Sequence, residues 1–309
     1  MRRLLLAPLL FVPGCVKPKG PDPASVLAAV FSIQPAKAQQ ALDALIQKSP
    51  KDPLIYNWRG RIRVDRLDFR GAFDDFSRAV ELDRNLAVAW YNRGNVRIDM
   101  GDYLGALRDL EVAYGLDNKL TGAVYSAGMA KLGMEDYAGA KEAFRLALKD
   151  EPGLSQALWR MGDALSGMGE MEDAVGFYDK ALEARPGSLS VLLARARTKR
   201  NLLDYAGATE DYSKVIELAP NLAMGYFERA QVYDDSMRSL AAIRDFDAAA
   251  RLAPAYPEVY QARGHANYHA GRNAEAVADW ETAIRMRPGY AADLRAYIGY
   301  ARKKMGKKR

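Results

Sequence analysis

The amino-acid sequence predicts an all-α fold in which helical hairpins stack into a solenoid. Its 309 residues contain a pattern that returns every 34 residues between positions 53 and 290. Within each period, apolar residues recur at helical spacing in two stretches, about positions 2–14 and 18–30 of the repeat. A hairpin of two amphipathic helices cannot bury its own apolar face, so neighbouring hairpins must stack.

Small residues mark the period most clearly. Counting each repeat from 1 to 34, with Ala87 as position 1 of the second, position 20 is always alanine: Ala72, Ala106, Ala140, Ala174, Ala208, Ala242 and Ala276. Position 8 is always glycine or alanine, and position 24 is large and apolar, from Phe76 to Trp280. We expect the small residues to let two helices approach closely and the large ones to fill the space beside them.

This pattern, closed in the later repeats by prolines such as Pro152 and Pro186, resembles the tetratricopeptide repeat, a helix–turn–helix unit of about 34 residues. The resemblance implies a right-handed superhelix whose concave groove holds a protein or peptide partner. Seven units follow: 53–86, 87–120, 121–154, 155–188, 189–222, 223–256 and 257–290. Residues 24–52 keep the phase weakly, as a degenerate repeat, and 291–309 predict a capping helix with a basic tail.

The N-terminus has the form of a secretory signal: a positive start, an apolar run from Leu4 to Val12 too short to span a bilayer, and Gly14 before Cys15. With Cys15 it resembles a bacterial lipobox. The resemblance implies that residues 1–14 are removed, that Cys15 is lipidated, and that the Pro-rich residues 15–23 form a tether. The alternatives are an ordinary cleaved signal or a cytosolic protein with an apolar start.

The residue after the cysteine is Val16 rather than aspartate. In the lipoprotein family this favours the outer membrane of a two-membrane cell, facing the periplasm. Cys15 is the only cysteine, which excludes a disulfide framework.

The net charge of +6 is not spread over the repeats. Arg2 and Arg3 lie in the predicted signal, and six basic residues lie among the last eight. The remainder holds 37 basic and 39 acidic side chains, a net charge of −2. A basic groove for phosphate contacts is therefore not expected, and an RNA-reading repeat is the least favoured function.

Arginine at position 7 and aspartate at position 23 occur together or not at all. The third and fourth repeats lack both, having Ala127 with Ala143 and Met161 with Phe177. Such covariation indicates contact between the two helices of one repeat, although a shared duplication history would give the same pattern. The predicted pairs are Arg59–Asp75, Arg93–Asp109, Arg195–Asp211, Arg229–Asp245 and Arg263–Asp279.

A candidate groove follows from positions 2, 5, 9, 12 and 13 of the first helix. Position 5 is large in five consecutive repeats, where a solvated face would be polar. We expect a binding groove there, with Gly122, Gly133 and Gly167 as bare positions beside it; the alternative is that position 5 packs between repeats. The groove residues are Tyr91, Asn92, Asn95, Tyr125, Met129, Trp159, Asp163, Arg197 and Phe227.

Neither catalysis nor a cofactor is predicted, because the chain has no phosphate-binding loop, dinucleotide fingerprint or nucleophile elbow. His265 and His269 lie four residues apart but lack a third metal ligand, so no metal site is expected. Some tetratricopeptide domains clamp a peptide carboxylate with lysines and asparagines. Asn92 and Asn95 match that set only in part, so the function is not carried over.

The predicted function is therefore a non-catalytic scaffold or adaptor of the bacterial cell envelope, which binds a protein or peptide in its groove. The alternative is a structural or oligomerisation spacer in envelope or pilus assembly. A spacer predicts a polar concave face, contrary to the large residues at position 5. The sequence does not identify the partner or the oligomeric state.

Overall fold

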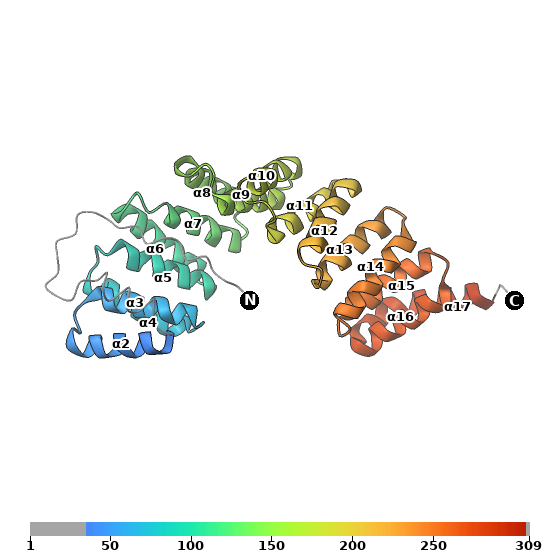
Figure 1. Cartoon of the computed structure of the whole chain (residues 1–309), viewed down its shortest axis with the longest axis horizontal. Coiled ribbons are helices and arrows are strands. Elements are labelled where there is room, and N and C mark those ends of the chain that lie inside the picture. The colour runs from blue at the N-terminus through green and yellow to red at the C-terminus, as the bar shows by residue number, and fades with distance from the viewer. Residues whose placement is uncertain (1–34, 307–309) are drawn as a thin grey trace. The chain divides into compact units, whose positions relative to one another are not determined.

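The computed structural model describes residues 35–306, and the described chain contains sixteen α-helices, one 3-10 helix and no strand, which confirms the all-α prediction (Figure 1). It divides into two compact units, one ending at Val96 and one beginning at Arg97. The boundary falls inside one helix, α5. The predicted signal peptide, Cys15 and the tether lie outside the described residues.

Each repeat contains a first helix that begins at position 1 and a second that ends at position 30. The first helix ends at position 13 in every repeat except the fourth, where it is one residue longer. The helices are α2 (Pro35–Lys48), α3 (Pro53–Asp65), α4 (Phe69–Leu82), α5 (Ala87–Asp99), α6 (Tyr103–Leu116), α7 (Thr121–Gly133), α8 (Tyr137–Asp150), α9 (Ser155–Met168), α10 (Met171–Ala184), α11 (Leu189–Asn201), α12 (Tyr205–Leu218), α13 (Ala223–Asp235), α14 (Ser239–Leu252), α15 (Pro257–His269), α16 (Asn273–Met286), η1 (Pro288–Tyr290) and α17 (Ala291–Gly306).

The second helix begins at an aspartate cap in four repeats. Asp102 Oδ1 accepts a hydrogen bond of 3.0 Å from the backbone N–H of Gly105, three residues later. This bond satisfies one of the unpaired N–H groups at the start of a helix. A Cβ on Gly105 would lie 2.2 Å from Asp102 Oδ2, so the cap and the glycine require each other. The same pairs recur at Asp68–Gly71, Asp136–Gly139 and Asp204–Gly207.

The turn between the two helices passes through a left-handed residue at position 15. Glycine takes this conformation in three repeats, with φ between 75° and 82° at Gly101, Gly169 and Gly271. Four repeats place a larger residue there, and φ is 61° at Met237. The left-handed region costs such a residue about 1–2 kcal/mol relative to the right-handed one. The packing of the two helices in each repeat therefore holds position 15 in the left-handed conformation even where the residue disfavours it.

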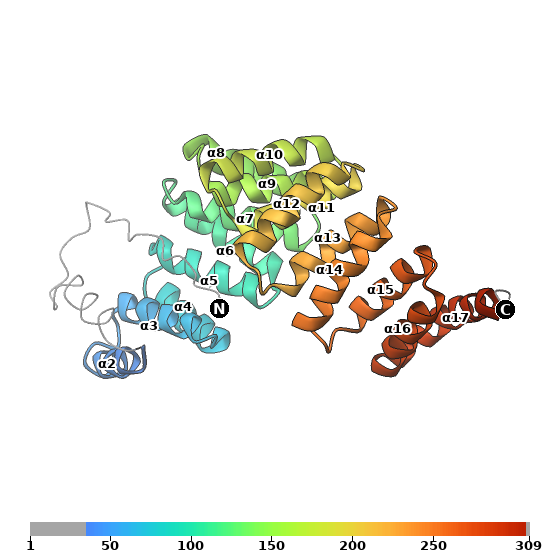
Figure 2. The same cartoon turned by 45° about the vertical axis from the view of Figure 1, so that its right-hand side comes forward.

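Packing inside a repeat depends on the small residue at position 8. The ring of Tyr178 lies directly against Gly162, where an added Cβ would be 2.5 Å from the ring. Gly60, Gly128 and Gly264 meet Phe76, Phe144 and Trp280 in the same way. All four rings are buried, as is every alanine at position 20. This contact places the second helix against the first, and the second helix then packs on the first helix of the next repeat (Figure 2).

The last described helix, α17, covers the seventh repeat. In α17, Leu294, Ile298 and Ala301 are buried in one cluster with Trp280 of α16. Helix α17 thus covers the apolar face of α16, as the terminal cap of a solenoid does. At the other end, α2 falls at positions 17–30 of the degenerate repeat, and its Leu42 packs with Ile55 of α3.

We predict that Gly162→Ala destabilises the protein by about 1–3 kcal/mol, because the added methyl group overpacks the ring of Tyr178. That ring has little freedom to move, since its hydroxyl donates a 2.9 Å hydrogen bond to Asp163. Urea unfolding measures the change. Gly176→Ala in α10 is the control: its methyl group would meet open space, and it should stabilise the helix by about 0.5–1 kcal/mol. Equal effects at both sites would contradict the close-contact role of position 8.

Candidate functional site

Arginine at position 7 forms a two-pronged pair with aspartate at position 23 in four repeats. Arg229 Nε and Nη2 donate to Asp245 Oδ2 and Oδ1 at 2.7 and 3.0 Å. The aspartate side chains of these pairs are nearly buried. The hydrogen bonds to Asp245 raise the pKa of Arg229 above its usual value. The same geometry joins Arg59 to Asp75, Arg195 to Asp211 and Arg263 to Asp279.

The same arginine also reaches back to the preceding repeat, a contact that the sequence reasoning missed. Its Nη1 donates a hydrogen bond to the side chain at position 25 of the preceding repeat. Arg195 donates to Asp179 at 2.5 Å, Arg229 to Ser213 at 2.9 Å, and Arg263 to Asp247 at 2.7 Å. Arg59 makes the equivalent bond to Asp43. The signal was present, because position 25 is aspartate or serine before every arginine at position 7 and neither before the other two repeats.

The fifth predicted pair, Arg93 with Asp109, joins residues of different units and stays a prediction. Within its own unit, Arg93 Nη1 lies 3.4 Å from Ser77 Oγ, which is again position 25 of the preceding repeat. Asp109 Oδ2 lies 3.4 Å from Arg97 Nη1.

The two repeats without the pair replace it differently. Met161 is buried in the core cluster, and Phe177 packs against the same cluster, so an apolar contact stands in for the ionic one. In the third repeat, Ala127 and Ala143 leave positions 7 and 23 without a long side chain. A buried ion pair is often replaceable by apolar residues of similar volume at little cost, and only the fourth repeat supplies that volume.

We predict that Arg229→Ala costs about 3 kcal/mol, because it leaves Asp245 charged with only 12% of its side chain exposed. Arg195→Ala should cost less, since Lys199 Nζ remains 3.1 Å from Asp211 Oδ2. Urea unfolding of Arg229→Ala, Asp245→Ala and the double variant measures the coupling. Additive losses would mean that the pair contributes no direct interaction energy.

The predicted groove residues of α7 and α9 are half-buried and pack against the core. Tyr125, Met129 and Trp159 all contact the buried cluster around Phe144 and Tyr178, and the Tyr125 ring centre lies 5.7 Å from that of Phe144. The Arg160 guanidinium lies 3.8 Å from the Trp159 ring centre. Part of each side chain therefore serves packing, as the alternative for position 5 held, and the rest is open to solvent.

Polar groove residues lie in networks along the first helices. Asp163 accepts hydrogen bonds from both Arg160 and Tyr178, each at 2.9 Å. Burial, together with the Asp163 charge, raises the pKa of the Tyr178 hydroxyl. Arg197 is exposed and lies 3.3 Å from Glu228 of the next first helix.

Phe227 differs from the expectation. Only 8% of it is exposed, and its ring centre lies 5.8 Å from that of Phe246 and 5.5 Å from that of Tyr256. It is a core residue with almost no surface for a partner, because the ring of Tyr256, the last residue of the same repeat, packs against it.

The N-terminal unit contains the remaining three groove residues. Asn92 Nδ2 donates a 2.9 Å hydrogen bond to Asn57 Oδ1 of the preceding first helix. Tyr91 and Asn95 are half-buried on the same helix.

Two of the glycines expected to be bare are covered. A Cβ on Gly133 would lie 2.4 Å from the Tyr103 ring, and one on Gly167 would lie 2.5 Å from the Tyr137 ring. Each tyrosine begins the second helix of the preceding repeat. The expectation that these two glycines are bare positions beside the groove is therefore wrong, because aromatic side chains of the protein already occupy the space.

The two histidines occupy different surroundings. The ring centre of His265 lies 5.3 Å from that of Trp280 and 5.0 Å from that of Tyr297, and burial lowers its pKa below 6.5. His269 Nδ1 lies 3.1 Å from Asp234 Oδ1. Within residues 35–306, no three histidine, cysteine or acidic side chains lie close enough together to hold a metal ion. No helix in the same range is both long enough and apolar enough to cross a membrane.

Three solved structures share this architecture. The chain aligns over 79% of its length with 98% of a tetratricopeptide repeat protein from Parabacteroides merdae, at 16% identity and a TM-score of 0.60. It aligns over 74% with 94% of the C-terminal part of a repeat protein from Cytophaga hutchinsonii, at 16% identity and a TM-score of 0.61. It also aligns over 78% with 48% of a chain of the APC/C hetero-tetramer Cut9–Hcn1, at 16% identity and a TM-score of 0.64.

At the sequence level, residues 125–188 match the family model for the tetratricopeptide repeat. No curated protein sequence matches the chain. The matched residues cover most of the third and fourth repeats, which are the two that lack the arginine–aspartate pair. Residues 125–188 are thus tetratricopeptide repeats by sequence, and the helical pairs on either side have the fold of a tetratricopeptide solenoid.

Proposed function

We propose that this protein is a non-catalytic scaffold of the bacterial cell envelope that binds a protein or peptide partner along the first helices of its repeats. Repeat proteins of this kind generally serve as interaction scaffolds, and one of the similar structures is itself part of a hetero-tetramer. The observation that carries the proposal is the set of half-buried Tyr125, Met129 and Trp159 on consecutive first helices. Large residues with one packed side and one solvated side are typical of binding surfaces.

The arrangement favours this face over the alternatives. Tryptophan and tyrosine provide contact area with few rotatable bonds, and methionine adapts to irregular partners. Two charged pairs, Arg160 with Asp163 and Arg197 with Glu228, lie on the same first helices or the next ones and would orient a polar segment. A structural spacer has no need of half-exposed aromatic residues in this position.

We predict that a photo-crosslinking amino acid at Met129 captures the partner in cells, whereas the same group at Leu146, on the second helix of that repeat, does not. Trp159→Ala should lower the cross-linked yield per folded molecule by about tenfold or more, the loss typical of a binding hot spot. Trp90→Ala is the matched control, since Trp90 also has an arginine over its ring but lies at position 4. Equal loss in both variants, or cross-linking only from Leu146, would contradict the proposed face.

The envelope location is a second part of the proposal, and it rests on the sequence around Cys15. A single acyl chain binds membranes only marginally, whereas the two or more chains of a lipidated N-terminal cysteine anchor a protein stably. We predict that Cys15→Ser remains uncleaved or moves to the soluble fraction, as measured by membrane fractionation and gel mobility. Lys17→Ser should fractionate like the unmodified protein. A Cys15→Ser variant of normal size that still sediments with membranes would exclude the lipid anchor.

A further inference from the structure

The third repeat interrupts the series of arginines that link one repeat to the next. In the fifth, sixth and seventh repeats, arginine at position 7 fills the space between its helix and the preceding second helix and donates to position 25 there. The third repeat has Ala127 at position 7, and the residue facing it at position 25 is Glu111. The acceptor is therefore present while the donor is missing.

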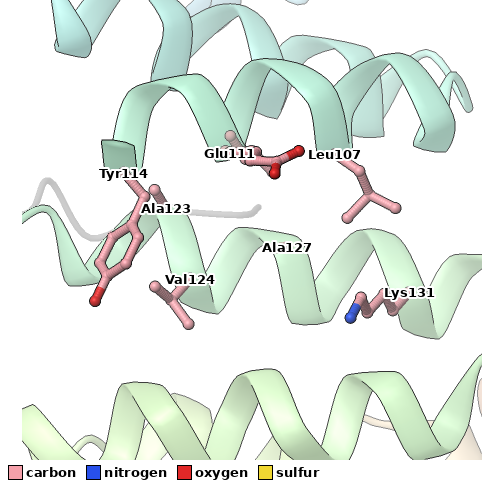
Figure 3. Close-up of a pocket in the computed structure, with 8 residues that line it drawn as sticks. Leu107, Glu111, Tyr114, Ala123, Val124, Ala127 and Lys131 are labelled. Carbon is pink, nitrogen blue, oxygen red and sulfur yellow. The ribbon is translucent and has the colours of Figure 1, made fainter. Parts of the chain in front are cut away.

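A cavity of about 290 Å³ lies at this position, between α6 and α7 (Figure 3). Leu107 and Tyr114 flank Glu111 on α6, and Val124 and Ala127 of α7 also line the cavity. No hydrogen bond or ion pair reaches the Glu111 carboxylate from any described residue. The fourth repeat offers the contrast, because its missing arginine is replaced by the buried side chain of Met161.

We propose that this cavity binds an arginine side chain supplied by a protein partner. The chain itself provides the template: the equivalent spaces hold Arg195, Arg229 and Arg263, each with its guanidinium on the position 25 side chain of the preceding repeat. In the same placement, the partner guanidinium donates to Glu111 and its aliphatic stem lies between Leu107 and Tyr114. Arginine is favoured over lysine because arginine occupies the equivalent spaces of the fifth, sixth and seventh repeats, and its Nη1 reaches position 25 from there.

Lys131 also lines the cavity, and its charge does not exclude a second cation. Its Nζ lies 3.5 Å from the Gly139 carbonyl oxygen, beside the turn of its own repeat. The equivalent Lys199 coexists with Arg195 in the fifth repeat, where both approach Asp211. Ala143, which replaces that aspartate, does not line the cavity, so the open space corresponds to the arginine and not to its aspartate partner.

The proposal rests on the proposed function, since it supplies one anchor for the protein partner, but it can be tested without knowing that partner. The full chain is labelled with ¹³C at alanine and valine methyl groups and titrated with N-acetyl-arginine N-methylamide. The methyl signals of Ala123, Val124 and Ala127 should shift with the arginine probe and remain in place with the citrulline analogue, which has the same shape but no charge. Glu111→Gln should weaken binding up to about fivefold, as expected for a solvent-accessible charged pair.

Two variants complete the test. Ala127→Arg should abolish the shifts, because the chain then fills its own cavity, and should raise the melting temperature. Glu142→Gln, in an exposed pair with Arg145, should leave binding unchanged. The proposal would be overturned if the methyl signals responded equally to the citrulline analogue or did not respond at all. It would also be overturned if the Glu111 and Glu142 variants bound the probe equally, or if Lys131→Gln abolished binding and Glu111→Gln did not. Trp159→Ala should not affect this titration. If the arginine probe does not bind but partner capture still depends on Trp159, the arginine proposal is wrong and the proposed function stands.

Discussion

The close contact between a small residue at position 8 and a large ring at position 24 is the constraint on which the rest of this structure depends. Tyr178 against Gly162 and Trp280 against Gly264 bring the two helices of a hairpin together without a gap. Because this contact sets the distance between the two helices, it also fixes where the other side of the second helix meets the next hairpin. The arginine bridges, wherever they occur, return with the same 34-residue period.

The position 7 arginine adds a different kind of link. It belongs to one repeat, pairs with that repeat's buried aspartate, and also binds the repeat before it, as Arg263 does with Asp279 and Asp247. One side chain thus connects three helices. The two interruptions show that the link is separable from the fold: one is filled by an apolar side chain and one is left open, yet the helical hairpins continue through both.

Much of this could be predicted from the sequence, because the seven copies of the repeat can be compared with one another. The apolar residues at helical spacing located the helices to within about one residue, and the joint loss of arginine and aspartate pointed to a contact. Periodicity assigns a residue to a face of its own helix, but it does not reveal what a neighbouring hairpin places over that face. For that reason the covered state of Gly133 and Gly167, the burial of Phe227, and the cavity beside Ala127 emerged only in three dimensions.

The left-handed turn at position 15 has a chemical consequence for the methionines. Met237 lies at such a turn with 85% of its surface exposed, whereas Met161 is 4% exposed inside the fourth repeat. Oxidation to the sulfoxide makes the thioether polar, which disrupts a core but is readily accommodated at a solvated turn. The exposed turn thus presents oxidants with a thioether that makes no core contact, while the sulfur atom of Met161 in the core is shielded.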